Sequence, residues 1–168
     1  MTAEDVIALL NLRPHPVEGG FFRETYRSEG SLPGSVLPAN GGPRSLGTAI
    51  YYMLTPNTFS ALHRLPTDEI YHFYLGDPIQ MLQLWPDGTT RTLLLGTDLR
   101  GGEVPQTVIP GGVWQGSYLL PGGKFALLGA TMAPGFDYED YVEGEREELT
   151  RIWPEQAEMI KLLTTRTV

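Results

Sequence analysis

Residues 60–76 read S-A-L-H-R-L-P-T-D-E-I-Y-H-F-Y-L-G, and this stretch decides the fold. It contains two of the three histidines of the chain, His63 and His72, with Glu69 between them. A Pro-containing bend separates two runs rich in apolar and aromatic residues, which is typical of paired strands. Polar side chains on such strands must offset the cost of their removal from water. The stretch therefore predicts a metal site, a ligand site or a set of satisfied hydrogen bonds.

Strand signals recur on both sides of this stretch, separated by short turns rich in Gly, Pro and Asp. Pro86-Asp87-Gly88 is a strong hairpin signal, and the 20 glycines and 14 prolines leave no long uninterrupted run. The predicted strands cover residues 21–27, 48–54, 59–65, 70–75, 79–85, 90–95, 107–109, 113–119 and 125–132. The pattern predicts an all-β sandwich or barrel.

Both ends of the chain have helical patterns instead. Thr2 is a predicted N-cap, with Asp5 in the capping-box position of a short amphipathic helix. Helical segments are predicted at 145–152 and 155–163, with apolar residues that would dock them on the sheet. Residues 28–45 are rich in Gly, Pro and Ser, and we expect a mobile surface loop there. The chain, residues 1–168, is predicted to form a single domain.

Composition excludes several classes of function. The net charge of −8 disfavours nucleic acid and anionic membranes as partners. The absence of cysteine excludes disulfides and thiolate metal sites, so any metal would need His, carboxylate or amide ligands. No apolar run approaches the length of a membrane span, and no leader-like segment begins the chain. We therefore expect a cytoplasmic protein.

Strand alternation assigns side chains to faces. His72 falls on the face opposite to Glu69, so the two are not expected to ligate one metal. His63 and Glu69 can meet if both face the interior, and Gln83 and Gln115 are also predicted to face inward. We predict that His63, Glu69 and Gln115 point into one cavity.

These residues resemble the motifs of the cupin superfamily. His63, Glu69 and Gly76 match the first histidine, the glutamate and the closing glycine of the first cupin motif, but Leu65 stands at the second histidine. P-G-G-V-W-Q at 110–115 matches the core of the second motif, with Gln115 at its histidine. Nearly the whole chain resembles the small cupins of the cupin-5 family, through residues 15–28, 48–54, 59–78 and 133–141.

The resemblance implies an RmlC-like jelly roll, a double-stranded β-helix, here with a short N-terminal helix and a C-terminal helical tail. Metal-dependent cupins use three histidines and one glutamate. Only one of those histidines is present here, so His63, Glu69 and Gln115 would form a weak divalent-metal site at most. We accordingly expect no cofactor. The resemblance also implies a homodimer, which the aromatic residues of 21–27 support.

The leading interpretation is a cupin-fold protein that binds a small polar metabolite inside the barrel. Its enzymatic form would be a metal-independent isomerase or epimerase, as in RmlC-type epimerases, with His63 as base and Tyr71 or Tyr52 as acid. Two alternatives remain open. One is a non-catalytic binding or sensor protein that uses the same pocket, and the other is a metal-dependent cupin enzyme.

Other residues are predicted to shape the pocket. Phe73 would form an apolar wall, while Gln83 and Gln115 would supply amide groups. Arg23 would grip a carboxylate or phosphate, or else belong to a half-solvated edge strand. His15 is interpreted as a turn histidine on the residues alone. The resemblance of its segment, H-P-V-E-G-G, to the cupin-5 family makes it a candidate for a functional role as well.

Overall fold

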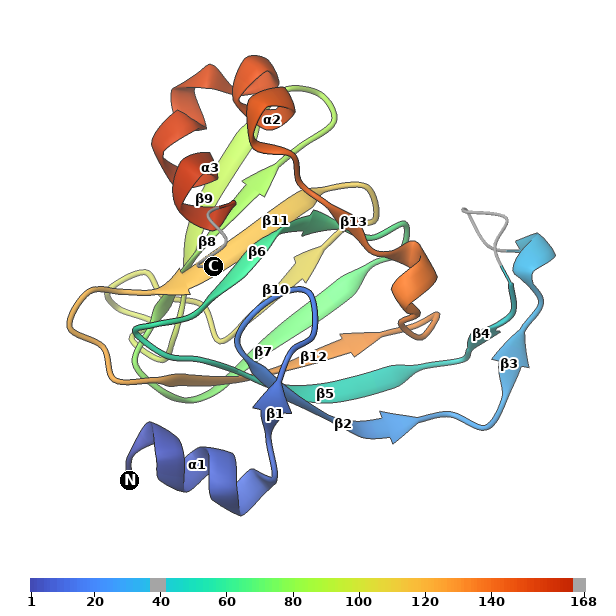
Figure 1. The fold of residues 1–168 in the computed structure, drawn as a ribbon, viewed down its shortest axis with the longest axis horizontal. Helices are drawn as coiled ribbons and strands as arrows, with labels where there is room; N and C mark the ends of the chain where they lie inside the picture. The colour runs from blue at the N-terminus through green and yellow to red at the C-terminus, as the bar shows by residue number, and fades with distance from the viewer. Residues whose placement is uncertain (37–41, 165–168) are drawn as a thin grey trace.

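The protein folds into two facing antiparallel sheets with helices at both ends of the chain, in a computed structural model that describes residues 1–36 and 42–164 (Figure 1). The first sheet has the strand order β1-β2-β5-β12-β7-β10. Its strands are β1 (Arg13–Pro14), β2 (Phe21–Arg27), β5 (Thr48–Leu54), β12 (Ala126–Met132), β7 (Glu69–Gly76) and β10 (Gln106–Ile109). This arrangement confirms the predicted jelly roll.

The second sheet has the order β13-β6-β11-β8-β9. Its strands are β13 (Val142–Glu143), β6 (Phe59–Arg64), β11 (Trp114–Leu119), β8 (Ile79–Leu84) and β9 (Thr90–Leu95). Strands β6 and β7 lie in different sheets, joined by the Pro66 bend. The chain that carries His63 and Glu69 therefore crosses from one sheet to the other, and the two residues face each other across the interior.

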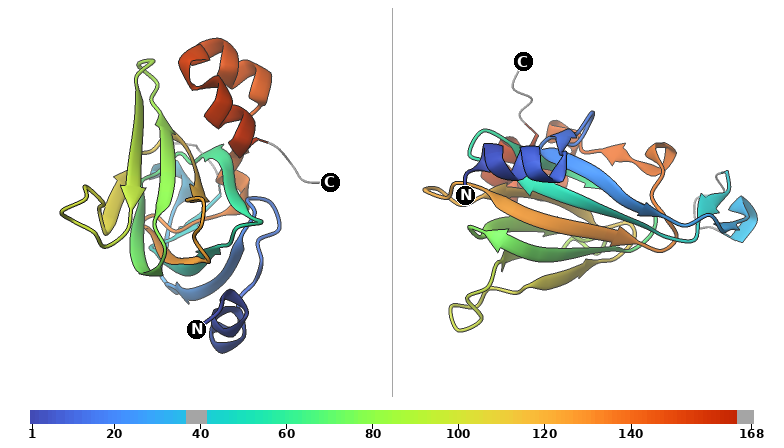
Figure 2. Two further views of the ribbon diagram at one scale, coloured as in Figure 1. Left: turned by 90° about the vertical axis from the view of Figure 1, so that its left-hand side faces the viewer. Right: turned by 90° about the horizontal axis from the view of Figure 1, so that it is seen from below.

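Figure 2 shows the layers from two further sides, with the N-terminal helix and the C-terminal helices at separate places on the outside of the sheets. Three apolar clusters hold these layers together. The central cluster lies between the sheets and includes Tyr52, Tyr71, Phe73 and Leu128. A second cluster packs the C-terminal helices against the outer face of the five-stranded sheet, through Leu62, Trp114, Leu149, Trp153 and Ile160. A third lies under the N-terminal helix and includes Val6, Met53 and Phe125. The docking of the C-terminal helices confirms the sequence prediction.

The helices begin and end close to the predicted positions. Helix α1 (Ala3–Leu10) has the predicted capping box, with Asp5 N–H donating to Thr2 Oγ1. The tail forms α2 (Arg146–Ile152), a 3₁₀ turn at Pro154–Gln156, and α3 (Ala157–Leu163). None of the helices in the described part of the chain is long and apolar enough to cross a membrane.

The predicted loop at 28–45 contains a small pair of strands. Strands β3 (Ser31–Leu32) and β4 (Arg44–Ser45) pair with each other, with a 3₁₀ turn (Gly34–Val36) between them. Residues 37–41, within the segment predicted to be a mobile loop, lie outside the described residues. The guanidinium of Arg44 is buried and bonds Asp140 at 2.8 Å, which ties this hairpin to the segment before β13.

The loop at residues 15–20 depends on its two glycines. Gly20 has a φ of +69°, and a Cβ at this position would lie 2.7 Å from the carbonyl oxygen of Met53. Only glycine allows both the backbone conformation and this close approach. The loop can therefore fold tightly against β5 and turn its side chains toward the barrel.

Gly20→Ala should lower the free energy of unfolding by about 1–3 kcal/mol more than Gly88→Ala, because overpacking is added to backbone strain. Gly88 is a matched control, since it also has a positive φ but open space around its Cβ position. Chemical denaturation of both variants gives the difference. Equal losses would show that the contact with Met53 does not restrict the loop.

Candidate functional site

The structure brings His63, Glu69 and Gln115 together inside the barrel. The amide nitrogen of Gln115 lies 3.4 Å from His63 Nε2 and also donates a hydrogen bond to Glu69 Oε2. All three side chains are buried, with exposed fractions of 1%, 7% and 2%. They come from β6, β7 and β11, so the cluster spans both sheets. The three side chains therefore meet in the interior, and of the three His63 and Glu69 border the cavity described below.

Hydrogen bonds define the tautomer of His63. Its Nδ1 lies 2.7 Å from the carbonyl oxygen of Ala61, which can only accept, so Nδ1 carries the hydrogen. In the neutral ring, Nε2 then has a lone pair directed toward the Gln115 amide nitrogen, from which it accepts a hydrogen bond. The ring of Tyr141 stacks on the imidazole, with centroids 4.9 Å apart. His63 is therefore held in an orientation that presents a basic nitrogen to the interior.

Glu69 behaves as a weak acid in this environment. Burial and then the nearby charge of Glu18 raise its pKa to about 8, against the opposing effect of the hydrogen bond from Gln115. Its carboxyl group is therefore largely protonated at neutral pH and can donate a proton. A basic imidazole nitrogen and a neutral carboxylic acid thus converge on one amide, an arrangement suited to proton transfer.

The raised pKa of Glu69 makes stability depend on pH. An ordinary value of 4.5 in the unfolded chain means that the folded state binds more protons between pH 4.5 and about 8. This contribution to stability is fully present below pH 4.5 and is lost as the pH rises through the folded-state pKa, by up to about 1.4 kcal/mol per pH unit.

Glu69→Gln should therefore flatten the fall in the free energy of unfolding between about pH 5 and about pH 8. Glutamine does not titrate, while the other groups that titrate in this range stay in place. Denaturation curves of wild type and variant at several pH values isolate the difference. Parallel pH profiles would mean that Glu69 is ionised in the folded protein throughout this range.

Glu18 is a site residue that sequence reasoning missed. Its Oε1 accepts a 2.5 Å hydrogen bond from Ser60 Oγ and a 3.5 Å bond from Tyr71, and its exposed fraction is 9%. The hydroxyl of Tyr52 donates to the carbonyl oxygen of Gly19 at 2.9 Å, which holds the loop against the barrel. The available signal was H-P-V-E-G-G itself, an acid followed by two glycines that let the loop turn inward.

His15 has more than the turn role assigned from the sequence. Its Nδ1 accepts a hydrogen bond from the backbone N–H of Glu18 at 2.9 Å, which is a turn interaction. Its ring also packs edge-on against Phe22, with centroids 4.6 Å apart, and borders the interior cavity. Burial lowers the pKa of His15, while the charge of Glu18 opposes that shift.

A cavity of about 160 Å³ opens beside this cluster. Among its lining residues His63, Glu69 and Glu18 are buried and mark its inner end, while Arg13, Glu24 and Arg27 are exposed and mark its outer part. The apolar part of its wall includes Phe22, Ile50, Leu65, Met132 and Phe136. Titratable groups converging at one end of a largely apolar cavity are typical of a small-molecule site.

The other residues predicted for the site lie deeper in the barrel. Tyr71 and Phe73 belong to the central core, and the hydroxyl of Tyr71 donates to Glu18 Oε1. Gln83 lies beside Gln115 across the β8–β11 pair, with its Nε2 3.7 Å from Met81 Sδ. Among the described residues, Gln83 Oε1 and Gln115 Oε1 have no hydrogen-bond partner. Buried amide oxygens in this state are available to a ligand or a water molecule.

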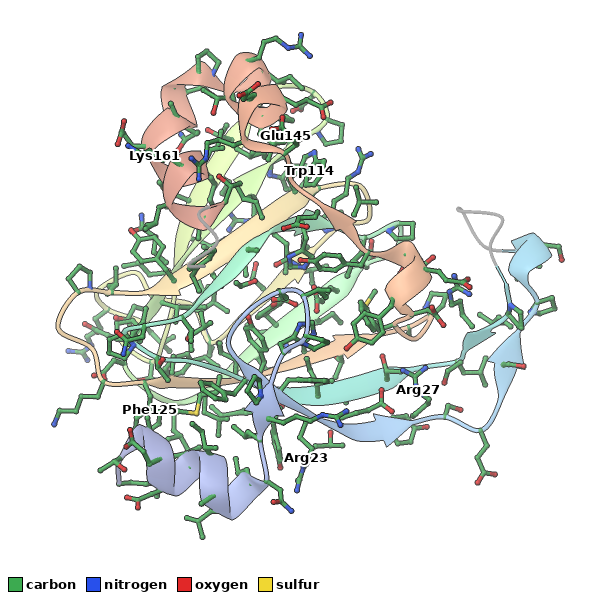
Figure 3. The ribbon with its side chains drawn as sticks, in the orientation of Figure 1. Arg23, Arg27, Trp114, Phe125, Glu145 and Lys161 are labelled. Atoms are coloured by element: carbon green, nitrogen blue, oxygen red, sulfur yellow. The ribbon has the colours of Figure 1, made fainter. Side chains whose placement is uncertain are left out.

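The prediction that Arg23 enters the pocket is wrong. Its guanidinium lies 5.4 Å from the ring centroid of Tyr51, and Figure 3 shows it below β2, on the side of α1. Phe22 takes the inward position instead. The pairing of β2 with β5 shifts register between Glu24 and Tyr26. This bulge brings Arg27 to the same face as Glu24, and both border the cavity.

The segment before β13 covers one side of the cavity. Phe136 N–H donates to Thr48 Oγ1 at 3.0 Å, and Arg27 donates to the carbonyl oxygen of Phe136. Arg44 holds Asp140, next to the Tyr141 that stacks on His63. These bonds fix the aromatic residues of the segment over the site.

The donor set does not fit a tightly bound transition metal. No group of three His, Asp or Glu side chains placed to hold a metal ion occurs within residues 1–36 and 42–164. One imidazole, one carboxyl group and one amide form a poor ligand set, and the Gln115 amide nitrogen donates to the very atoms that would ligate the ion. A weakly held divalent ion remains the most that these residues predict.

Comparison with known proteins defines the class. Residues 4–142 match the family Cupin_5, described as "Cupin superfamily (DUF985)", and the chain belongs to this family. It is 35% identical over 158 residues to the uncharacterised protein YML079W of Saccharomyces cerevisiae. The match covers 87% of this chain and 78% of the yeast protein.

Solved structures agree with this assignment. A hypothetical protein from Leishmania major has a TM-score of 0.89 at 31% identity, covering 99% of this chain and all of that one. Protein SO0799 from Shewanella oneidensis has a TM-score of 0.86 at 34% identity, covering 98% of each chain. Oxalate decarboxylase of Bacillus subtilis aligns at a TM-score of 0.55 and 15% identity, over 94% of this chain and 38% of that one, which supports the fold alone.

Proposed function

We propose that the protein binds a small polar metabolite inside the barrel and moves a proton on it without a metal. The observation that carries this proposal is the convergence of His63 Nε2 and the Glu69 carboxyl on Gln115 at the inner end of the cavity. The two groups have complementary roles. In its neutral tautomer His63 carries a lone pair on Nε2, which a ligand reaches by displacing the Gln115 amide, and Glu69, with its raised pKa, retains a proton.

The reaction class is isomerisation or epimerisation next to a carbonyl group. His63 Nε2 removes a proton from the carbon beside the carbonyl, and the electron pair of that C–H bond moves to form the enol. Glu69 donates its proton to the carbonyl oxygen, which gives an enediol when the first carbon carries a hydroxyl group. The protonated His63 then delivers its proton to the former carbonyl carbon, and the hydroxyl of the first carbon returns a proton to Glu69 as the new carbonyl forms. Epimerisation differs in that a second acid must protonate the original carbon from its opposite face. Tyr71, the acid predicted from sequence, is a weaker candidate, since burial and the charge of Glu18 raise its pKa well above the ordinary value.

A non-catalytic binding or sensor protein is the second candidate. The observation that favours it is the hydrogen bond from Gln115 to His63 Nε2, because this bond occupies the lone pair that a base needs. Catalysis would require the ligand to displace the amide from His63. Turnover of the ligand separates the two candidates.

Native mass spectrometry of freshly purified protein tests the proposal. We expect an adduct with the mass of a small metabolite in the wild type and its loss in His63→Gln. The outer-face variant His72→Gln is the matched control, because His72 bonds Thr131 and Gln106 away from the cavity. An adduct that persists unchanged in His63→Gln would contradict binding at this site.

A cytoplasmic homodimer is also part of the proposal. The cysteine-free composition supports a reducing compartment. Tyr26, Tyr74 and Val108 on the six-stranded sheet are about half exposed, with fractions of 57%, 47% and 46%, and a second copy could cover part of this surface. Light scattering across a range of concentrations should give twice the chain mass. A monomer mass that stays constant across the concentration range would contradict the proposed homodimer.

A further inference from the structure

The outer part of the cavity has two arginines with different partners. The guanidinium of Arg27 is already engaged, with Glu24 Oε2 at 2.7 Å and with the carbonyl oxygen of Phe136. The guanidinium of Arg13 lies 5.1 Å from the ring centroid of Phe22. Within residues 1–36 and 42–164, no carboxylate forms an ion pair with Arg13. Arg13 is therefore free to bind a ligand.

The position of Arg13 is unusual for a chain with a net charge of −8. Acidic side chains are abundant, yet this guanidinium faces the cavity with an aromatic ring as its neighbour. Its charge also acts on Tyr138 at the same part of the wall, where it partly offsets the rise in pKa that burial causes. Such a cation beside a cavity attracts anions and selects against cations.

The inner end imposes the opposite requirement. Glu18 lies there with Glu69, so a negative group on the ligand would be repelled by Glu18. The lone pair of His63 and the acid form of Glu69 suit a neutral group that both donates and accepts, such as a hydroxyl or a carbonyl with an acidic C–H. A ligand with one charged end must therefore place that end at Arg13.

The size of the cavity limits the ligand further. A volume of about 160 Å³ is close to that of an engineered cavity that holds benzene, roughly 150 Å³, so only a few non-hydrogen atoms fit. We propose that the ligand is a small hydroxy- or oxo-carboxylate, bound with its carboxylate on Arg13 and its hydroxyl or carbonyl group at His63 and Glu69. This inference rests on the proposed function, since it names the substrate class of that site.

The test uses pairs of probes that differ only in charge. Lactate and pyruvate are compared with lactamide and pyruvamide by ligand-observed NMR titration of the wild type, Arg13→Gln, Arg23→Gln and His63→Gln. The wild type should bind each carboxylate at least about tenfold more tightly than its amide, as expected for a charge-assisted bidentate contact. Arg13→Gln should remove this preference and leave amide binding unchanged. Arg23→Gln loses the same charge on the outer face and should behave as the wild type.

The outcomes distinguish this inference from the proposed function. Equal binding of carboxylates and amides by the wild type, or equal weakening by Arg13→Gln and Arg23→Gln, would overturn the ligand class and leave the site itself in place. Binding of both probe types that is unaffected by His63→Gln would overturn the proposed function even if Arg13 selects for charge. Failure of every probe to bind the wild type would overturn the proposed ligand class.

Discussion

The double variant Leu65→His, Gln115→His should retain a divalent transition-metal ion through purification. Leu65 borders the cavity just past the end of β6, two residues after His63, and the Gln115 amide contacts both His63 and Glu69. Two new imidazoles at these positions would complete a set of three histidines and one glutamate around one point. Affinity for zinc or nickel should rise by about a thousandfold or more, as for other protein sites with a full ligand set.

The single variants are the controls for this prediction. Each adds one imidazole and should give an intermediate affinity, while Gln115→His also removes the amide that donates to His63 and Glu69. Elemental analysis and competition with a chromophoric chelator measure content and affinity. An unchanged affinity in a correctly folded double variant would mean that Leu65 and Gln115 are not directed at the point where His63 and Glu69 meet.

His63→Gln should lower the rate of proton exchange on the bound ligand by about a thousandfold, within the range for loss of a general base. Glutamine keeps a polar side chain of similar length but has no basic nitrogen. The readout is the wash-in of deuterium from heavy water into the acidic C–H of the metabolite that co-purifies with the wild type, followed by NMR. His72→Gln should exchange at the wild-type rate, because His72 lies on the outer face.

Two further measurements separate loss of the base from loss of the folded structure. Circular dichroism and the denaturation midpoint check that His63→Gln is folded, since the stack of His63 on Tyr141 is also lost. Glu69→Gln should lower the exchange rate as well, because the amide has no carboxyl proton to donate. Exchange at the wild-type rate in His63→Gln would exclude this histidine as the base and favour the non-catalytic binding protein.

The fold could be predicted closely because its signals are local. Strands β2, β5 and β9 have the bounds expected from alternation and turns, and the other predicted strands shift by one residue at one or both ends. The two-residue strands β1, β3, β4 and β13 were not predicted, because so short a run carries no alternation. The capping box at Thr2 and the docking of the C-terminal helices also follow from short-range patterns. The meeting of His63 with Glu69 and Gln115 was predictable because strand parity assigns all three to the interior.

The remaining part of the site depends on features that local patterns do not contain. Phe22 and Glu24 take the inward positions of β2, so Arg23 lies on the opposite face. The bulge between Glu24 and Tyr26 then reverses the parity and brings Arg27 to the cavity. Glu18 and His15 come from a loop, and the sequence does not specify across which part of the barrel that loop folds. The contact of Glu18 with Ser60 and the contact of His15 with Phe22 place both residues at the cavity, and neither contact is encoded in a local pattern.

The effect of chelation on proton exchange tests the central claim most directly. The wild-type protein, dialysed against a strong chelator and checked by elemental analysis, should exchange the ligand proton at its original rate, because His63 and Glu69 supply both base and acid. The same sample without chelation should contain far less than one transition-metal ion per chain. A stoichiometric metal that is lost on chelation together with exchange, and restores exchange when added back, would contradict the account and establish a metal-dependent cupin enzyme.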